Sequence, residues 1–313
     1  MGNELAGKVA LVTGASRGIG KAIATRYAAE GAAVAVCSRP SPGMEQLGTL
    51  ERAVEDLRAM GGPVLGVPFD LGDESTDVAE LVAQVEQELG PVDILVNNAA
   101  AGGYKPFMDW SDRSIRHVLQ LNFWAPWNLV RAVLPGMRQR GRGWIINVSS
   151  ASAKPPTGPP FPPTAPSATG TIYGGTKAFL DRWTASLAAE VVTEGIAVNT
   201  LAPQAAAATE VLVEYSDIPP ELYEPLETMA EAALVLATAD PTRLTGRIAY
   251  SLELLAEMDR PTLDLAGGHA LDDWAPARLK ERMDLMRANA LGTRPGAGRS
   301  NVADLSSILR DDA

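Results

Sequence analysis

The segment "TGASRGIG", Thr13 to Gly20, places three glycines between an apolar run and a helical pattern. "KVALVTG" leads into it, and "GIGKAIATRYAAEG" continues from it with Ile19, Ile23 and Tyr27 spaced four apart on one face. Glycines between a strand and a helix permit a tight turn and let backbone N–H groups approach a pyrophosphate. The segment therefore predicts the first strand, turn and helix of a dinucleotide-binding fold.

Short apolar runs alternate with helical patterns along most of the chain. Continuous apolar strands that alternate with amphipathic helices indicate a parallel sheet covered on both faces. We therefore predict an α/β fold: a single doubly wound Rossmann-type domain over residues 1–258, with a seven-stranded parallel sheet and helices on both faces. The predicted strands are 8–14, 32–38, 63–70, 93–98, 144–150, 196–203 and 247–255, and the longest predicted helices are 111–140 and 173–194.

The chain continues beyond the last predicted strand. Residues 259–313 are predicted to form a C-terminal extension that is partly helical. Trp274, Leu279, Met283 and Met286 lie at near-helical spacing in this extension. An apolar stripe of this kind requires burial against the same subunit or a neighbour.

Composition and charge argue against a nucleic-acid-binding function. The chain has 313 residues, of which 46% are hydrophobic, and 27 Lys and Arg against 38 Asp and Glu give a formal charge of −11. This acidic balance opposes nucleic-acid binding. The basic run "RQRGR" (138–142) is a candidate patch for an acidic partner, with a solvated helix end as the alternative.

The single cysteine and the two histidines bear on the cellular compartment and on metal binding. The single cysteine, Cys37, allows no disulfide within the chain and favours a reducing compartment. The sequence has no uncharged apolar stretch that is long enough to predict a membrane span, so we expect a cytoplasmic protein without membrane association. His117 and His269 lack the spacing of metal ligands, and no metal site is predicted.

Tyr173 and Lys177 belong to the segment "YGGTK" at the start of a predicted helix. Residues four apart share one face of a helix, so the phenol and the ammonium are expected to lie together. A nearby cation favours the phenolate and lowers the pKa of the tyrosine toward the working pH. The pair is therefore a candidate for passing a proton to or from a substrate oxygen.

Several segments match one known pattern in the correct order. The glycines follow T-G-x-x-x-G-x-G, and "NNAA" (97–100), "LQLNF" (119–123), "INVSS" (146–150) and "YGGTK" (173–177) follow. Over residues 8–255 the chain resembles the short-chain dehydrogenase/reductase family. The resemblance implies an oxidoreductase that uses a nicotinamide cofactor, with Asn122, Ser150, Tyr173 and Lys177 as its catalytic residues.

The resemblance also implies roles for these residues. Ser150 would hydrogen-bond the substrate oxygen, Lys177 would also hold the nicotinamide ribose, and Asn122 would anchor a water that relays protons. Asp70 resembles the family's adenine-contacting aspartate. The residues predicted to bind the cofactor are Gly14, Ser16, Arg17, Gly18, Ile19, Gly20, Ser38, Arg39, Asp70, Leu71, Asn98, Ala99, Tyr173, Lys177, Pro203 and Thr209.

The chain departs from the family pattern at two positions. Ala100 replaces the glycine that usually ends the "NNAG" segment, and Gln204 replaces the glycine that usually follows the proline at Pro203. The fold of this second loop, and the role of Thr209 in it, stay open from the sequence alone.

The residues after the second predicted strand favour one nicotinamide cofactor. In this fold an acidic side chain at that place binds the ribose 2′-hydroxyl of NAD, whereas arginine accommodates the 2′-phosphate of NADP. Here the strand ends in Ser38 and Arg39 without a carboxylate, and Arg17 adds a second cation. The pair predicts NADP(H).

A proline-rich insertion, residues 153–170, separates Ser150 from Tyr173. Its segment "KPPTGPPFPPTAP" cannot be a helix or a central strand, because proline lacks an N–H and fixes φ. Both flanking residues must meet one carbonyl oxygen, so the insertion is expected to bulge at the carboxyl end of the sheet, where ligands bind. We predict that it borders the substrate cleft and that Phe161 points inward; a surface loop without substrate contact is the alternative.

The sequence leaves three functional hypotheses. The first is an NADP(H)-dependent oxidoreductase that interconverts a ketone or aldehyde and an alcohol. The second is a 3-oxoacyl-carrier-protein reductase, which the acidic charge disfavours. The third is a cofactor-binding regulator without catalysis. The family resemblance also implies a homodimer or homotetramer.

Overall fold

The computed structural model describes residues 2–40, 43, 45–161, 169–216 and 218–290, with side chains described as far as residue 285. A seven-stranded sheet runs through its centre in the order β3-β2-β1-β4-β5-β6-β9, and every neighbouring pair is parallel. The predicted doubly wound parallel sheet is therefore confirmed. The strands are β1 Val9–Thr13, β2 Ala33–Ser38, β3 Val64–Pro68, β4 Ile94–Asn97, β5 Gly143–Val148, β6 Ile196–Ala202 and β9 Ile248–Tyr250.

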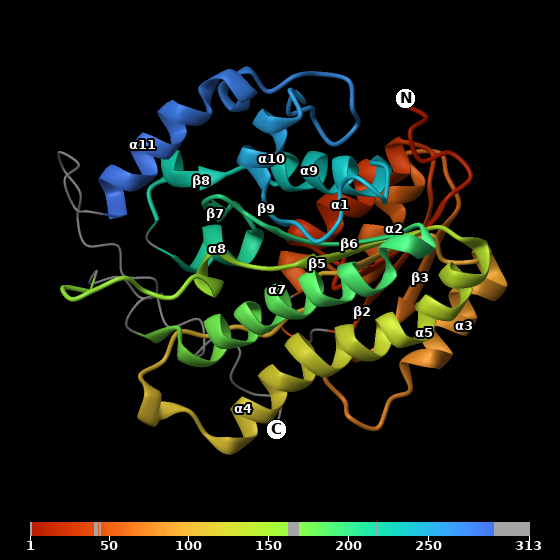
Figure 1. The fold of residues 1–313 in the computed structure, drawn as a ribbon, viewed down its shortest axis with the longest axis horizontal. Coiled ribbons are helices and arrows are strands. Elements are labelled where there is room, and N and C mark those ends of the chain that lie inside the picture. The colour runs from red at the N-terminus through yellow and green to blue at the C-terminus, as the bar shows by residue number, and fades with distance from the viewer. Residues whose placement is uncertain (1, 41–42, 44, 162–168, 217, 291–313) are drawn as a thin grey trace.

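Helices cover both faces of the sheet, with α1 and α9 on one side and α5 and α7 on the other (Figure 1). Alternate residues of β1 enter the two cores: Ala10 and Val12 join the first, and Val9 and Leu11 join the second. The first face carries α1 Gly18–Ala29, α2 Leu50–Arg58 and α9 Leu226–Thr238; the second carries α3 Val78–Leu89, α4 Asp112–Leu119, α5 Ala125–Arg140 and α7 Thr171–Val191.

The strand order reverses at β1, which pairs with β2 on one edge and with β4 on the other. In open α/β sheets, ligands bind beyond the carboxyl ends of the strands at such a reversal. The segment "TGASRGIG" starts at the last residue of β1. The fold thus brings the glycines to the place where a dinucleotide would bind.

The predicted last strand, 247–255, is too long. The strand β9 ends at Tyr250, and Ser251–Glu257 form helix α10. The sequence "LELLAE" consists of residues with good helix propensity and no β-branched side chain. Leu252, Leu254 and Leu255 are all buried in this helical turn, which explains why an apolar run alone suggested a strand.

The predicted helix 111–140 is interrupted. Between α4 and α5 lies a π-helical turn, η3, Gln120–Trp124. Short π-helical turns inside longer helices are frequent at functional sites. Asn122, one of the predicted catalytic residues, lies in this turn.

The described part of the C-terminal extension packs back on the domain. Arg260 donates to Glu231 of α9 at 2.6 Å, and the same carboxylate group accepts from the buried Arg26 of α1 at 2.9 Å. Farther along, Leu279–Ala290 form α11, which contacts α10. Trp274 and Met283 are half-buried there, and the side chain of Met286 is outside the described residues.

Candidate functional site

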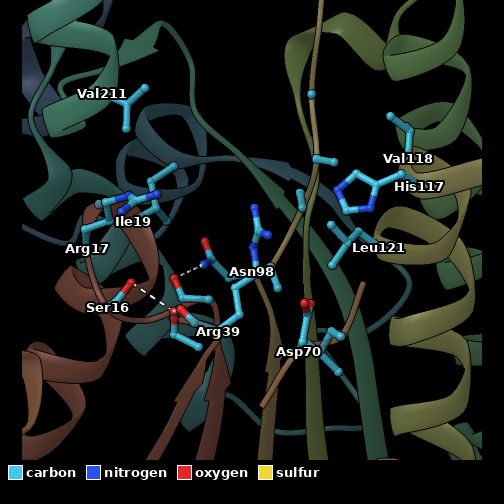
Figure 2. A pocket seen from close by; sticks show the side chains of 18 of the residues that line it. Ser16, Arg17, Ile19, Arg39, Asp70, Asn98, His117, Val118, Leu121 and Val211 are labelled. Atoms are coloured by element: carbon cyan, nitrogen blue, oxygen red, sulfur yellow. Dashed lines mark hydrogen bonds between the residues drawn. The ribbon is translucent and has the colours of Figure 1, made fainter. Parts of the chain in front are cut away.

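A cleft of about 610 Å³ opens at the carboxyl edge of the sheet. In Figure 2, Arg17, Ile19 and Val211 lie on one side of it, and His117 and Leu121 lie on the other. This volume suits a cofactor or a small ligand. The predicted cofactor residues that line the cleft are Gly14, Ser16, Arg17, Gly18, Ile19, Ser38, Arg39, Asp70, Leu71, Asn98, Ala99 and Thr209; Gly20, Tyr173, Lys177 and Pro203 are outside this lining.

Two glycines of the loop are required by close packing. Gly14 has a φ of 63°, and a Cβ there would lie 2.8 Å from the Cα of Ala99. A Cβ at Gly20 would lie 2.4 Å from Nδ2 of Asn98, which donates to the carbonyl of Thr13 at 2.8 Å. The glycine loop and the segment after β4 are therefore packed together so closely that no side chain fits between them.

The backbone N–H of Gly18, at the N-terminus of α1, donates to the carboxylate of Glu210 at 2.9 Å. Glu210 begins a short helix, α8 Glu210–Tyr215, which Thr209 caps. The carboxylate thus accepts from a group that an anion such as a phosphate would use at a helix N-terminus. Sequence reasoning did not identify Glu210, because nothing local links it to a residue 192 positions away.

Glu224 holds the loop in which Gln204 replaces a glycine. The carboxylate of Glu224 is fully buried and accepts from the N–H of Ala205 at 2.8 Å and from the hydroxyl of Thr228 at 2.5 Å. The loop then forms a short parallel pair, β7 Ala206–Ala207 with β8 Tyr223–Glu224. This arrangement brings the methyl of Thr209 to 3.2 Å from where a Cβ of Gly18 would lie.

Two arginines line the cleft where β2 ends. Burial lowers the pKa of Arg17, Glu210 opposes this shift, and the neighbouring Arg39 adds to it. Nη1 of Arg17 is buried and has no hydrogen-bond partner among the described residues. An orphaned guanidinium nitrogen beside a second arginine fits a phosphate, which accepts charge-assisted hydrogen bonds.

Asp70 and His117 lie on the other side of the cleft from Arg17 and Ile19 (Figure 2). Oδ1 of Asp70 accepts from the N–H of Gly72 at 2.8 Å, which fixes the turn after β3. Burial lowers the pKa of His117, and the cation of Arg39 lowers it further. His117 is therefore a neutral cleft residue, a role that its lack of metal-ligand spacing did not suggest.

The structure brings together Tyr173, Lys177 and Ser150. Tyr173 and Lys177 lie one turn apart on α7, with Nζ of Lys177 5.8 Å from the centre of the Tyr173 ring. Lys177 is buried and donates to the carbonyl of Val148 at 2.7 Å. The side chain of Ser150, just beyond β5, lies close enough to Tyr173 to lower the pKa of its phenol.

The Tyr173 ring lies directly behind the cleft. A Cβ at Gly102, which lines the cleft, would lie 3.5 Å from this ring. Asn122 holds the same segment, because its side chain accepts from the N–H of Ala101 at 2.9 Å and donates to its carbonyl at 2.8 Å. Asn122 also donates to Thr176, beside Lys177, at 3.0 Å. It therefore ties the segment after β4 to α7.

The expected effect of Lys177 on the phenol is not observed. Burial raises the pKa of Tyr173 well above the ordinary value of a phenol, the neighbouring Tyr104 raises it further, and the hydrogen bond with Ser150 opposes this. Burial also lowers the pKa of Lys177 to about 8, against the attraction of Asp181. Desolvation outweighs the cation here. Tyr173 therefore keeps its proton at neutral pH.

The aromatic residue that was predicted to point into the cleft lies elsewhere. Phe161 is 59% exposed, and its ring packs against Gly158 of its own insertion instead of pointing into the cleft. Gly158 has no side chain, so the ring finds its contact locally. Trp110 packs against the second core and also lines the cleft beside Lys105, whose Nζ lies 5.3 Å from the ring centre.

Among the residues that the structure describes, no group of three or more His, Cys, Asp or Glu side chains is placed to hold a metal ion. In the same part of the chain, no helix is both long and apolar enough to cross a membrane.

Comparisons with known proteins identify the family of this chain. A ketoacyl reductase of Nostoc sp. is 33% identical over 218 residues, which are 70% of this chain and 70% of that protein. The crystal structure of a metagenomic short-chain oxidoreductase in complex with NADP is similar, with a TM-score of 0.63 and 28% identity over 79% of this chain and 98% of the other. The crystal structure of a 3-oxoacyl (acyl-carrier-protein) reductase from Agrobacterium tumefaciens with NADP bound has a TM-score of 0.65 and 26% identity, covering 79% of this chain and 93% of the other. Residues 8–217 match the family model described as short chain dehydrogenase, and the chain therefore belongs to the short-chain dehydrogenase/reductase family of oxidoreductases.

Proposed function

We propose that this chain is an NADP(H)-dependent oxidoreductase that interconverts a ketone or aldehyde and the corresponding alcohol. The observation that carries the proposal is the placement of Ser150 beside Tyr173, with the buried ammonium of Lys177 one turn away. These groups lie behind the inner end of a cleft that is large enough for a cofactor.

In this proposal, Ser150 and Tyr173 bind one carbonyl oxygen. Each hydroxyl carries one proton that it can donate to that oxygen. When bound, NADPH supplies a hydride to the carbonyl carbon and is oxidised to NADP⁺. Tyr173 passes its proton to the oxygen, so the alcohol forms, and Lys177 stabilises the phenolate that remains.

The cofactor would be held from three sides. The N–H groups of the glycine loop, at Gly18 in particular, would bind the pyrophosphate after Glu210 has moved away. Arg17 and Arg39 would bind the 2′-phosphate, and this choice of NADP is supported by the NADP found in similar structures. The adenine would lie against Asp70 and Leu71, and the nicotinamide near Tyr173, Lys177, Pro203 and Thr209.

A screen of aldehydes and ketones tests this function. We expect NADPH absorbance to decay with at least one carbonyl, and we expect the decay to be lost in Tyr173→Phe. Titration of NADPH against both proteins is the control, because it should give similar affinities. A protein that binds NADPH tightly and turns over nothing in a varied panel would instead be a cofactor-binding regulator.

Reduction of a 3-oxoacyl group on a carrier protein is the second candidate. The ketoacyl reductase among the relatives favours it. The basic run 138–142 does not, because Arg138 pairs with Glu194 at 2.5 Å and Arg142 pairs with Asp93 at 3.3 Å. Acetoacetyl-CoA separates the two: a kcat/KM far above that of small ketones would favour the thioester.

We also propose a homodimer or homotetramer built on α5 and α7. A chain of ring contacts joins these helices, from Phe123 to Trp127 and Phe179 and from Trp127 to Trp183. Trp124 and Phe179 are 48% and 42% exposed on this surface. Sedimentation analysis of the wild type and Trp124→Glu tests the assembly, since the charge should dissociate it.

A further inference from the structure

A second pair of tyrosine and serine hydroxyls lies beside the first. The hydroxyl of Tyr104 and Oγ of Ser152 are 2.8 Å apart. The rings of Tyr104 and Tyr173 meet edge to face, with centroids 5.8 Å apart and an interplanar angle of 78°. The two pairs, Ser150 with Tyr173 and Ser152 with Tyr104, are therefore neighbours.

The backbone fixes the second pair as firmly as the first. Ser152 lies in a short helix, η4 Ala151–Ala153, directly after Ser150, and its N–H donates to Oγ of Ser150 at 3.2 Å. This helix packs on the first turn of α7 so closely that a Cβ at Gly174 would lie 2.5 Å from the carbonyl oxygen of Ser152. Tyr104 comes from the segment after β4, the strand next to β5.

The second pair has a proton that it can donate to a ligand. Tyr104 and Ser152 are half-buried. Burial raises the pKa of Tyr104, the hydrogen bond with Ser152 opposes this shift, and the phenol therefore stays protonated at neutral pH. The two hydroxyls use one proton between them and keep one for a ligand oxygen. A ligand at the first pair would thus meet a second oxygen-binding pair within the length of a small molecule.

We propose that Tyr104 and Ser152 bind a second oxygen of the substrate. The substrate is a carbonyl compound that carries a hydroxyl or another carbonyl one or two carbons from the reacting one. This inference rests on the proposed oxidoreductase function. The reacting oxygen lies at Ser150 and Tyr173, and the second oxygen accepts the free proton of the other pair.

Matched small carbonyls test the proposal. Butanone has one oxygen, acetoin has the same four-carbon skeleton with a hydroxyl beside the ketone, and ethyl acetoacetate places its second carbonyl one carbon farther. We expect the wild type to reduce at least one of the oxygenated compounds with a kcat/KM about tenfold above that of butanone, since one net hydrogen bond is worth about a factor of ten. The higher kcat/KM should come mainly from a lower KM, because the second oxygen does not react.

Variants separate binding from intrinsic reactivity. For each protein, the kcat/KM of the oxygenated compound is divided by the kcat/KM of butanone. Tyr104→Phe and Ser152→Ala should each lower this ratio by about tenfold. Tyr27→Phe is the matched control, since its buried phenol donates to the carbonyl of Ala233 at 2.9 Å between α1 and α9, away from the cleft. It should leave that ratio unchanged.

The outcomes distinguish the two proposals. No turnover of any of the three carbonyls, with NADPH binding intact, would contradict the oxidoreductase function itself. Turnover in which Tyr104→Phe lowers kcat/KM for butanone and the oxygenated compounds equally would contradict only the second oxygen site. NADPH affinity and the melting temperature of each variant, measured alongside, show whether a loss comes from the fold.

Discussion

The two halves of the cleft are built in different ways. The cofactor half, around the glycine loop and the ends of β1 to β3, is fixed by backbone groups in close approach, as at Gly14 and Gly20. The substrate half, so called from the proposed function, consists mainly of residues 101–105 after β4 and the segment that follows β5, and the loop after β6 lies between the two halves. These segments are irregular and are held by side chains such as Asn122, Glu224 and the Tyr104–Ser152 pair.

The difference follows from what each half has to bind. A pyrophosphate and a ribose are the same for every enzyme that uses the cofactor, so a backbone cradle suffices. A substrate varies between enzymes, and side chains on a rigid scaffold can change without disturbing the sheet. Substitutions in the two halves should accordingly affect different measurements.

The largest effect is expected at Tyr173, which lies where the two halves of the cleft meet. Tyr173→Phe removes the only proton that the mechanism passes to the substrate, so kcat should fall by about 10²–10⁴-fold. The dissociation constant for NADPH, measured by fluorescence, should change little. Lys177→Ala should instead lower kcat and also weaken NADPH binding. A Phe variant with most of its activity would contradict the mechanism.

Gly20→Ala tests the close packing of the cofactor half. The added methyl would meet Nδ2 of Asn98 at 2.4 Å and displace it from the glycine loop. Overpacking of this kind costs about 1–3 kcal/mol, so the dissociation constant for NADPH should rise by about tenfold or more.

Gly175→Ala is the matched control for that substitution. Gly175 is exposed in α7, and a Cβ there would have no neighbour within 4 Å. It should leave NADPH binding intact and raise the melting temperature slightly, because alanine favours the helix. Equal NADPH affinities in both variants would show that the glycine loop tolerates a side chain.

Arg39→Ala tests the choice of cofactor. A charge-assisted hydrogen bond to the 2′-phosphate would be lost, so NADPH should bind about tenfold more weakly while NADH changes little. Arg58→Ala, at the exposed end of α2, is the control. Equal affinities of the wild type for the two cofactors would overturn the assignment to NADP(H).

The cofactor half was largely predictable from the sequence. A strand, a glycine turn and a helix are local, and "TGASRGIG" carries all three. Ser38 and Arg39 follow a strand whose end is equally clear. The one contact missed there, Glu210 on Gly18, joins residues 192 positions apart.

The substrate half was less predictable, because its contacts depend on how distant loops meet. Tyr104 and Ser152 are 48 residues apart, and neither forms a motif. The expectations for Phe161 and for the pKa of Tyr173 were wrong for one reason: both depend on burial, which sequence spacing does not report.

The charge of Lys177 should make cofactor binding depend on pH. Burial lowers its pKa to about 8, so the ammonium is present below that pH and is lost above it. If Lys177 holds the ribose, the dissociation constant for NADPH should rise several-fold between pH 7 and pH 9. Lys177→Ala should remove this dependence, and an unchanged slope in that variant would assign the titration to another group.

The smallest effect is expected from the proline-rich insertion, which belongs to the substrate half by position alone. Residues 155–161 of the insertion are exposed, and Lys154 just before them packs over the ring of Tyr250 at 3.9 Å. Replacing residues 155–166 with a short Gly/Ser linker keeps Lys154 and all four proposed catalytic residues. We expect KM values to change several-fold and the ranking of carbonyl substrates to shift, with NADPH affinity preserved. Prolines limit the shapes that a loop can adopt, so a flexible linker should enclose the substrate less well. An unchanged ranking across the panel would mean that the insertion is a surface loop and that the segments after β4 and β6 alone form the substrate wall.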